Sequence, residues 1–222
     1  MPYALFPEVF MIVTKAKDFE IIKENLKEYK KIAVIGCGRC ATSCSTGGEA
    51  EVLEMKKRLE EIGKQVVYVK VMEVPCDERI VKKEFAKVDL DNVDCILTMC
   101  CGSGTSSIND LIDRRVVPAL DSLFLGVIKR AGDYDERCSM CGECILDLTY
   151  GICPVTRCSK GLLNGPCGGS VNGRCEVDSD HDCAWSMIYE KLKKYGKLEN
   201  MEKFWKPKNY KIAIKPQKLK TK

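Results

Sequence analysis

Apolar residues in the first half of the chain follow two periods in turn, one typical of helices and one typical of strands. Helical spacing occurs in four stretches, at residues 18–30, 49–62, 77–88 and 105–113. Short apolar or β-branched runs lie between and after them, at residues 31–36, 65–72, 94–99 and 116–124. Strands separated by helices of this length imply βαβ crossovers and a parallel sheet covered by helices. The pattern therefore predicts an α/β fold with a doubly wound parallel sheet.

The hydrophobic pattern changes after residue 132, and the predicted structure changes with it. Residues 1–132 are the predicted α/β domain, with a cluster site at the edge of its sheet. Residues 133–183 contain many glycines and little apolar material for a core, which predicts an irregular segment organised by metal. Residues 184–222 begin with helical spacing as far as Tyr195 and continue as a basic extension, with 12 lysines and 3 glutamates in all.

Length and composition narrow the class of protein. The 222 residues are 45% hydrophobic and 31% charged, as in soluble globular proteins, which excludes disordered and collagen-like chains. Prolines and Glu8 interrupt the apolar start, so we expect no secretory signal, and no apolar run approaches the ~20 residues of a membrane helix. The fifteen cysteines are therefore expected in a reducing, cytoplasmic setting, where dense thiols bind metal or carry out redox chemistry.

Seven of the cysteines lie in the predicted α/β domain, and six of these follow predicted strands. In doubly wound, flavodoxin- or Rossmann-like sheets, the carboxyl ends of the strands meet at one edge, where ligands bind. A loop with Cys-x2-Cys-x3-Cys spacing offers three thiolates to one cluster, and the loop Cys101-Gly-Ser-Gly has free amides for cluster sulfurs. Cys76 is a close second choice for the fourth ligand. We predict a metal site formed by Cys37, Cys40, Cys44 and Cys101.

Other interpretations of this first group are weaker. Residues 36–41 match the G-x-G-x-x-A fingerprint of dinucleotide binding, but Cys40 and Cys44 would crowd a pyrophosphate and the acidic partner is poorly placed. The Cys-x2-Cys-x3-Cys order is the reverse of the radical S-adenosylmethionine spacing. Simple burial of three thiols in one loop is uncommon, whereas Cys95, inside a predicted strand, fits a buried apolar thiol.

The other eight cysteines lie within residues 138–183 and give the strongest signal in the chain. Three at x2 spacing suit one face of a cubane, although eight residues, not the three of bacterial ferredoxins, precede Cys153-Pro154. Eight thiolates complete two sites, either two cubanes or one cubane and one zinc. With the first group, we expect two or three [4Fe-4S] clusters, with zinc open for one site. The predicted ligands are Cys138, Cys141, Cys144, Cys153, Cys158, Cys167, Cys175 and Cys183.

The sole histidine, His181, lies between two aspartates, which favours a solvated loop residue over a metal ligand.

Four blocks of this segment resemble the methylenetetrahydrofolate reductase C-terminal family, in particular its MetV-type small iron–sulfur subunits. The blocks are residues 138–146, 151–160, 163–169 and 173–177, of which Leu-Asn-Gly-Pro-Cys-Gly-Gly is highly specific. Residues 36–49 and 101–104 are similar to that subunit too, so the resemblance runs from about residue 31 to 195. The doubled Cys100–Cys101 replaces a single cysteine, which leaves the fourth ligand open among Cys76, Cys100 and Cys101.

The resemblance implies an electron-transfer subunit in one-carbon, Wood–Ljungdahl-type metabolism. Electrons would pass to or from the flavin of a partner catalytic subunit, with ferredoxin or heterodisulfide-reductase-like proteins as further partners. The chain has no counterpart of the flavin-binding barrel, which needs about 250 residues, so we do not expect it to be catalytic alone. Tetrahydrofolate and tetrahydromethanopterin both remain open as carriers. The alternative is a zinc-stabilised scaffold that anchors the flavoprotein. A role as a corrinoid or methyl-transfer partner is disfavoured, because the chain lacks the Asp-x-His-x-x-Gly motif that supplies the cobalt ligand.

The basic extension interleaves lysines with Tyr195, Phe204, Trp205 and Tyr210, as a nucleic-acid stacking surface does. Because the motifs of the chain are redox motifs, we prefer docking of this extension to the acidic remainder of the chain or to a partner subunit, not to nucleic acid or a membrane. We expect that deletion after Gly196 weakens partner association and leaves the iron content intact.

Overall fold

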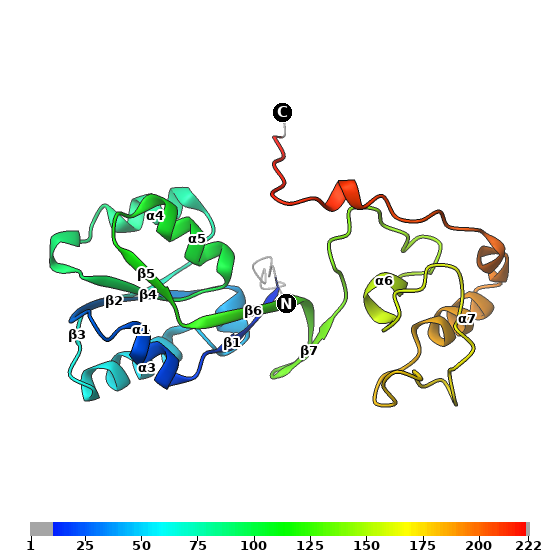
Figure 1. The fold of residues 1–222 in the computed structure, drawn as a ribbon, viewed down its shortest axis with the longest axis horizontal. Helices are drawn as coiled ribbons and strands as arrows, with labels where there is room; N and C mark the ends of the chain where they lie inside the picture. Colours follow the sequence, from blue (N-terminus) through cyan, green and yellow to red (C-terminus); the bar gives the residue numbers. More distant parts are fainter. Residues whose placement is uncertain (1–10, 221–222) are drawn as a thin grey trace, which may run out of the picture. The chain divides into compact units, whose positions relative to one another are not determined.

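The computed structural model describes residues 11–220, and the chain divides into two compact units, one ending at Asp135 and one beginning at Glu136 (Figure 1).

A parallel sheet of four strands forms the centre of the first unit. Its strands follow the order β3-β2-β4-β5, so the chain crosses β2 on its way from β3 to β4. All three pairings are parallel, and Ile32 of β2 pairs with Val66 on one side and with Cys95 on the other. The predicted α/β class with a parallel sheet is confirmed. The strands are β2 (Lys31–Cys37), β3 (Gln65–Met72), β4 (Cys95–Met99) and β5 (Arg115–Pro118).

Helices cover both faces of this sheet. Figure 1 shows α4 and α5 on one face and α1 and α3 on the other. Asp18 and Asp77 cap α1 and α4, because each side chain accepts a hydrogen bond from the backbone two residues on. The central strands β2 and β4 are buried on both sides, which explains their continuous apolar runs. The helices are α1 (Phe19–Asn25), α2 (Cys40–Ser43), α3 (Glu49–Glu61), α4 (Glu78–Phe85), η1 (Leu90–Asn92) and α5 (Gly102–Leu111).

A glycine sets the path of the chain where β2 ends. A Cβ atom at Gly36 would stand 2.5 Å from the carbonyl oxygen of Gly47. The backbone amide of Cys37 donates to that same oxygen at 2.9 Å. The loop after β2 therefore folds back onto the strand end, and this close approach requires a residue without a side chain.

The single strand predicted at residues 116–124 is wrong, because the structure divides it in two. β5 ends at Pro118, and after Ala119 the strand β6 (Leu120–Arg130) belongs to a second sheet with the order β1-β6-β7. In that sheet β1 (Ile12–Ala16) pairs antiparallel with β6, and β7 (Asp133–Glu136) lies on the other side. The periodicity did not indicate this second sheet, since β6 is exposed over most of its length.

The second unit contains little regular structure, as the glycine-rich sequence predicts. Its buried core is small and is built on α7, whose Trp185, Ile188 and Leu192 pack with Ile152 and Cys183. The predicted helix at residues 184–195 is confirmed. The elements are α6 (Pro154–Arg157), α7 (Ala184–Lys194), η2 (Leu198–Glu202) and η3 (Tyr210–Ala213). Within residues 11–220, no helix is long and apolar enough to cross a membrane.

Candidate metal centres

The first unit places thiols at the carboxyl ends of three neighbouring strands. Cys37 is the last residue of β2 and Cys40 is the first residue of α2. Cys101 follows β4 as the N-cap of α5, and Cys76 follows β3. Burial raises the pKa of Cys40, and the neighbouring Cys37, Cys101 and Cys76 thiols raise it further. The strand ends thus bring together the thiols that the topology predicts.

Local contacts hold the loop after β3 against its neighbours. The amide of Gly38 donates to the carbonyl of Met72 at 2.7 Å, and Arg39 forms an ion pair with Glu73 at 2.7 Å. Pro75, beside Cys76, lies 3.1 Å from the place that a Cβ atom on Gly104 would take. The missing side chain at Gly104 therefore lets the Cys76 loop approach the start of α5.

Two thiols near this group have other surroundings. Cys44 accepts from the amide of Thr14 at 3.5 Å and donates to the carbonyl of Ile12 at 3.8 Å, so it faces β1. Cys100 is 1% exposed and donates to the carbonyl of Ile35 at 3.6 Å. Burial, with the charges of neighbouring thiols, raises the pKa of Cys100 well above its ordinary value. Each of these two thiols is thus engaged with backbone.

Burial also raises the pKa values of Cys40 and Cys76, and the neighbouring thiols add to both shifts. A metal that binds these thiols must therefore displace protons that the free group retains at neutral pH. In the same loop, the Nη1 atom of Arg39 is buried and has no hydrogen-bond partner. That positively charged donor suits an anionic group among the thiols.

Four cysteines of the second unit line one hollow of about 610 Å³ that opens to solvent. Three of them come from the loop at residues 138–144, and the fourth precedes α6 as its N-cap. Gly142 has a φ of +81°, which allows the tight turn between the second and third thiols. The hollow is lined by Cys138, Cys141, Cys144 and Cys153.

The remaining four cysteines line a separate and smaller hollow. Two backbone hydrogen bonds close the loop around this hollow. The amide of Cys175 donates to the carbonyl of His181 at 2.9 Å, and the amide of Cys183 donates to the carbonyl of Gly173 at 2.7 Å. The eight predicted ligands thus divide into two groups of four, a partition that their spacing alone left open. The second hollow is lined by Cys158, Cys167, Cys175 and Cys183.

Three thiols of the second unit have lowered pKa values. For Cys141, burial raises the pKa, but hydrogen bonds from the Lys208 side chain and with the Glu143 backbone outweigh it. A hydrogen bond with the Ser159 hydroxyl lowers the pKa of Cys175, and the Ser159 Oγ lies 3.6 Å from the Cys175 Sγ. Cys183 is the N-cap of α7, and hydrogen bonds at Ser186 outweigh the effect of its burial. Lowered pKa values favour thiolates, the form that binds metal.

His181 does not line either hollow of cysteines. Its Nδ1 lies 2.9 Å from a carboxylate oxygen of Asp178, and its side chain is 71% exposed. This placement agrees with the predicted solvated loop histidine.

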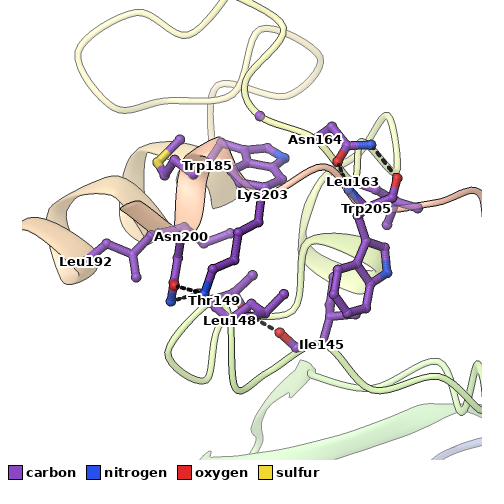
Figure 2. Close-up of a pocket in the computed structure, with 13 residues that line it drawn as sticks. Ile145, Leu148, Thr149, Leu163, Asn164, Trp185, Leu192, Asn200, Lys203 and Trp205 are labelled. Carbon is purple, nitrogen blue, oxygen red and sulfur yellow. Dashed lines mark hydrogen bonds between the residues drawn. The ribbon is translucent and has the colours of Figure 1, made fainter. Parts of the chain in front are cut away.

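The C-terminal extension packs on the cysteine-rich loops of its own unit (Figure 2). Asn164 donates to the carbonyl of Trp205 at 2.9 Å and accepts from its amide at 2.6 Å. Asn200 donates to the carbonyl of Leu148 at 3.0 Å. Asn164 belongs to the Leu-Asn-Gly-Pro-Cys block, which ends at Cys167. This block therefore also binds the extension. Sequence reasoning missed this role, because side-chain bonds to backbone leave no periodic signal.

Within residues 11–220, no three or more histidine, cysteine, aspartate or glutamate side chains are arranged so that they could hold a metal ion.

A comparison with protein families identifies part of this architecture. Residues 117–211 match the family model described as "Methylene-tetrahydrofolate reductase C terminal". The match covers less than half of the chain and supports a relationship with methylenetetrahydrofolate reductases. It includes both groups of four cysteines and most of the extension, which the predicted resemblance left outside. The thiols of the first unit lie before it. No curated protein and no solved structure shows significant similarity to the chain.

Proposed function

We propose that the chain is an electron-transfer subunit of a methylenetetrahydrofolate reductase complex, related to the MetV-type iron–sulfur subunits. One observation carries the proposal. Eight cysteines within the matched region divide into two groups of four, and each group lines its own hollow. Four thiolates are the ligand set of a cubane cluster. The family match supports a role related to that reductase, and the cysteine groups support redox chemistry within it.

Each hollow offers four thiols, the ligand number of a [4Fe-4S] cluster. In a cubane each thiolate binds a different iron atom, so the four sulfurs stand farther apart than around one ion. We assign Cys138, Cys141, Cys144 and Cys153 to one cluster, and Cys158, Cys167, Cys175 and Cys183 to the other.

We take the parallel sheet of the first unit to be doubly wound, and we place a third cluster at its edge. Cys37, Cys40 and Cys101 are three of its ligands. The fourth is Cys76 or Cys44. We favour Cys76 because, after burial, the nearby Cys101 and Cys37 thiols raise its pKa, whereas Cys44 bonds to β1. The orphaned Nη1 of Arg39 suits the negative charge of such a cluster.

Bound clusters would supply one-electron transfer, and the residues of this chain hold and shield them. Reduction of the methylene group takes place at a flavin on a partner subunit in this proposal. The chain passes electrons between that flavin and a donor such as ferredoxin or a heterodisulfide-reductase-like protein. The carrier is tetrahydrofolate or tetrahydromethanopterin.

Anaerobic metal analysis tests this function. We expect about eight iron atoms from the second unit and about four more from the sheet edge, with matching sulfide. The brown colour should bleach with dithionite, and the reduced chain should reduce the flavin of the catalytic subunit. Cys95→Ala, which removes a thiol buried in β4, is the control and should retain all iron. A colourless chain that contains only zinc would instead identify a scaffold.

A further inference from the structure

The segment that contains η3 closes over the loop at residues 138–144. Lys208 Nζ donates to the carbonyl of Glu143 at 3.3 Å, and the amide of Asn209 donates to the Glu143 carboxylate at 3.0 Å. Ile212 occupies the place that a side chain on Gly142 would take. Three contacts thus fix this segment on the turn between the second and third thiols of the first hollow.

The Lys208 ammonium also lies beside a thiol of this hollow. Its Nζ and the Cys141 sulfur approach the same acceptor, the carbonyl oxygen of Glu143, at 3.3 and 3.6 Å. Ammonium, sulfur and carbonyl therefore meet at one corner of the loop. The carboxylate of Glu143 accepts the amide of Asn209 at 3.0 Å.

We propose that Lys208 is a positioning residue that holds Cys141 in the first hollow and raises the reduction potential of the cluster bound there. The inference rests on the proposed function. Reduction adds a negative charge to a cluster, so a fixed cation beside one of its sulfurs stabilises the reduced form. Hydrogen bonds from outside the ligand set also orient ligands. The basic extension would then set the potential of a redox centre in its own unit.

Potentiometric titration of the full, reconstituted chain tests the proposal, with electron paramagnetic resonance as the readout. The variant is Lys208→Met, which keeps the length of the side chain and removes its charge. We expect one cluster to become about tenfold harder to reduce, which is 59 mV for a one-electron step. Lys208→Arg should restore most of the potential. The control is Lys211→Met, three residues on, because Lys211 is exposed and forms its hydrogen bonds through its backbone.

The outcomes separate the inference from the proposed function. A wild-type chain without iron would overturn both. A wild-type chain with iron whose potentials are unchanged in Lys208→Met, or fall equally in Lys211→Met, would overturn the inference alone. Loss of iron from Lys208→Met and Lys208→Arg alike would show a purely structural role and overturn it too. Loss from Lys208→Met with a nearly normal potential in Lys208→Arg would support it.

Discussion

Two thiols near the edge of the parallel sheet donate hydrogen bonds to backbone carbonyls, Cys44 to Ile12 and Cys100 to Ile35. A thiol that satisfies a buried carbonyl contributes to the fold, and its loss leaves that carbonyl without a partner. Cys76, by contrast, lies in an exposed loop beside the other strand ends. At the scale of single residues, hydrogen bonding therefore separates structural thiols from candidate ligands of the same residue type.

Serine substitutions test this separation. Cys76→Ser should lower the iron content by about four atoms per chain, because a cubane without one of its four thiolates is poorly held. Cys44→Ser should retain the iron, since its hydroxyl can still donate to Ile12. Iron and sulfide analysis of both variants measures the difference. The opposite result would assign Cys44, as its sequence spacing predicts, to the cluster.

The burial of Cys95 leads to a prediction about the pH dependence of stability that does not depend on bound metal. It is fully buried in β4, and burial raises its pKa from 9.0 to about 12. The folded chain therefore retains a proton that the unfolded chain releases near pH 9, so this stability is present below pH 9 and is lost as the pH rises towards 12. Between about pH 8 and 10 the wild-type chain should lose about 1 kcal/mol from this residue.

Urea unfolding at several pH values measures the effect of Cys95. Cys95→Ala is less stable than the wild type at pH 8 because it leaves a cavity. The difference between the two free energies of unfolding should narrow as the pH rises. A constant difference would mean that Cys95 does not titrate on unfolding in this range.

At the scale of elements, periodicity and strand-end chemistry were enough for the parallel sheet and for the gathering of its thiols. Ile32 to Ile35 form a continuous buried run, which only a covered parallel strand explains. The second sheet escaped prediction because β6 is mostly exposed, and β5 and β6 are adjacent in sequence. The division of eight cysteines into two groups could not be predicted, since it depends on how glycine turns fold back the loops. The extension escaped too, because Asn164 and Asn200 bind backbone atoms.

Adjacent aromatic residues of the extension test its packing. Trp205 lines the hollow of Figure 2 together with α7, whereas Phe204 is 76% exposed. We expect Trp205→Ala to destabilise the second unit by about 2 kcal/mol, within the range for removal of a large side chain from a partly buried site. Phe204→Ala should change the stability by less than about 0.5 kcal/mol. The denaturant midpoints of the two metal-loaded variants measure the difference. Equal destabilisation by both substitutions would contradict the packing of Trp205 against α7.

These contacts also change the expectation for truncation. Because Lys208 and Trp205 bind the cysteine-rich loops, a chain that ends at Gly196 should lose iron as well as partner affinity. The sequence alone favoured a docking segment without a role in the metal sites.

For the whole molecule, the division at residues 135 and 136 separates two sources of stability. The first unit buries a large core between its helices and sheet, while five buried residues form the core around α7 in the second. A segment with so small a core needs bound metal to offset the entropy of ordering its loops. Metal removal should therefore unfold the second unit and leave the first folded.

The two tryptophans report this difference directly, because Trp185 and Trp205 are the only ones in the sequence and both belong to the second unit. Trp185 is 6% exposed and donates to the carbonyl of Leu162 at 3.0 Å. Treatment with reductant and an iron chelator should shift the fluorescence maximum to the red, as water reaches the indole. Circular dichroism should retain the helix signal of the first unit. Buried tryptophan emission from a metal-free chain would mean that the core around α7 is stable without metal.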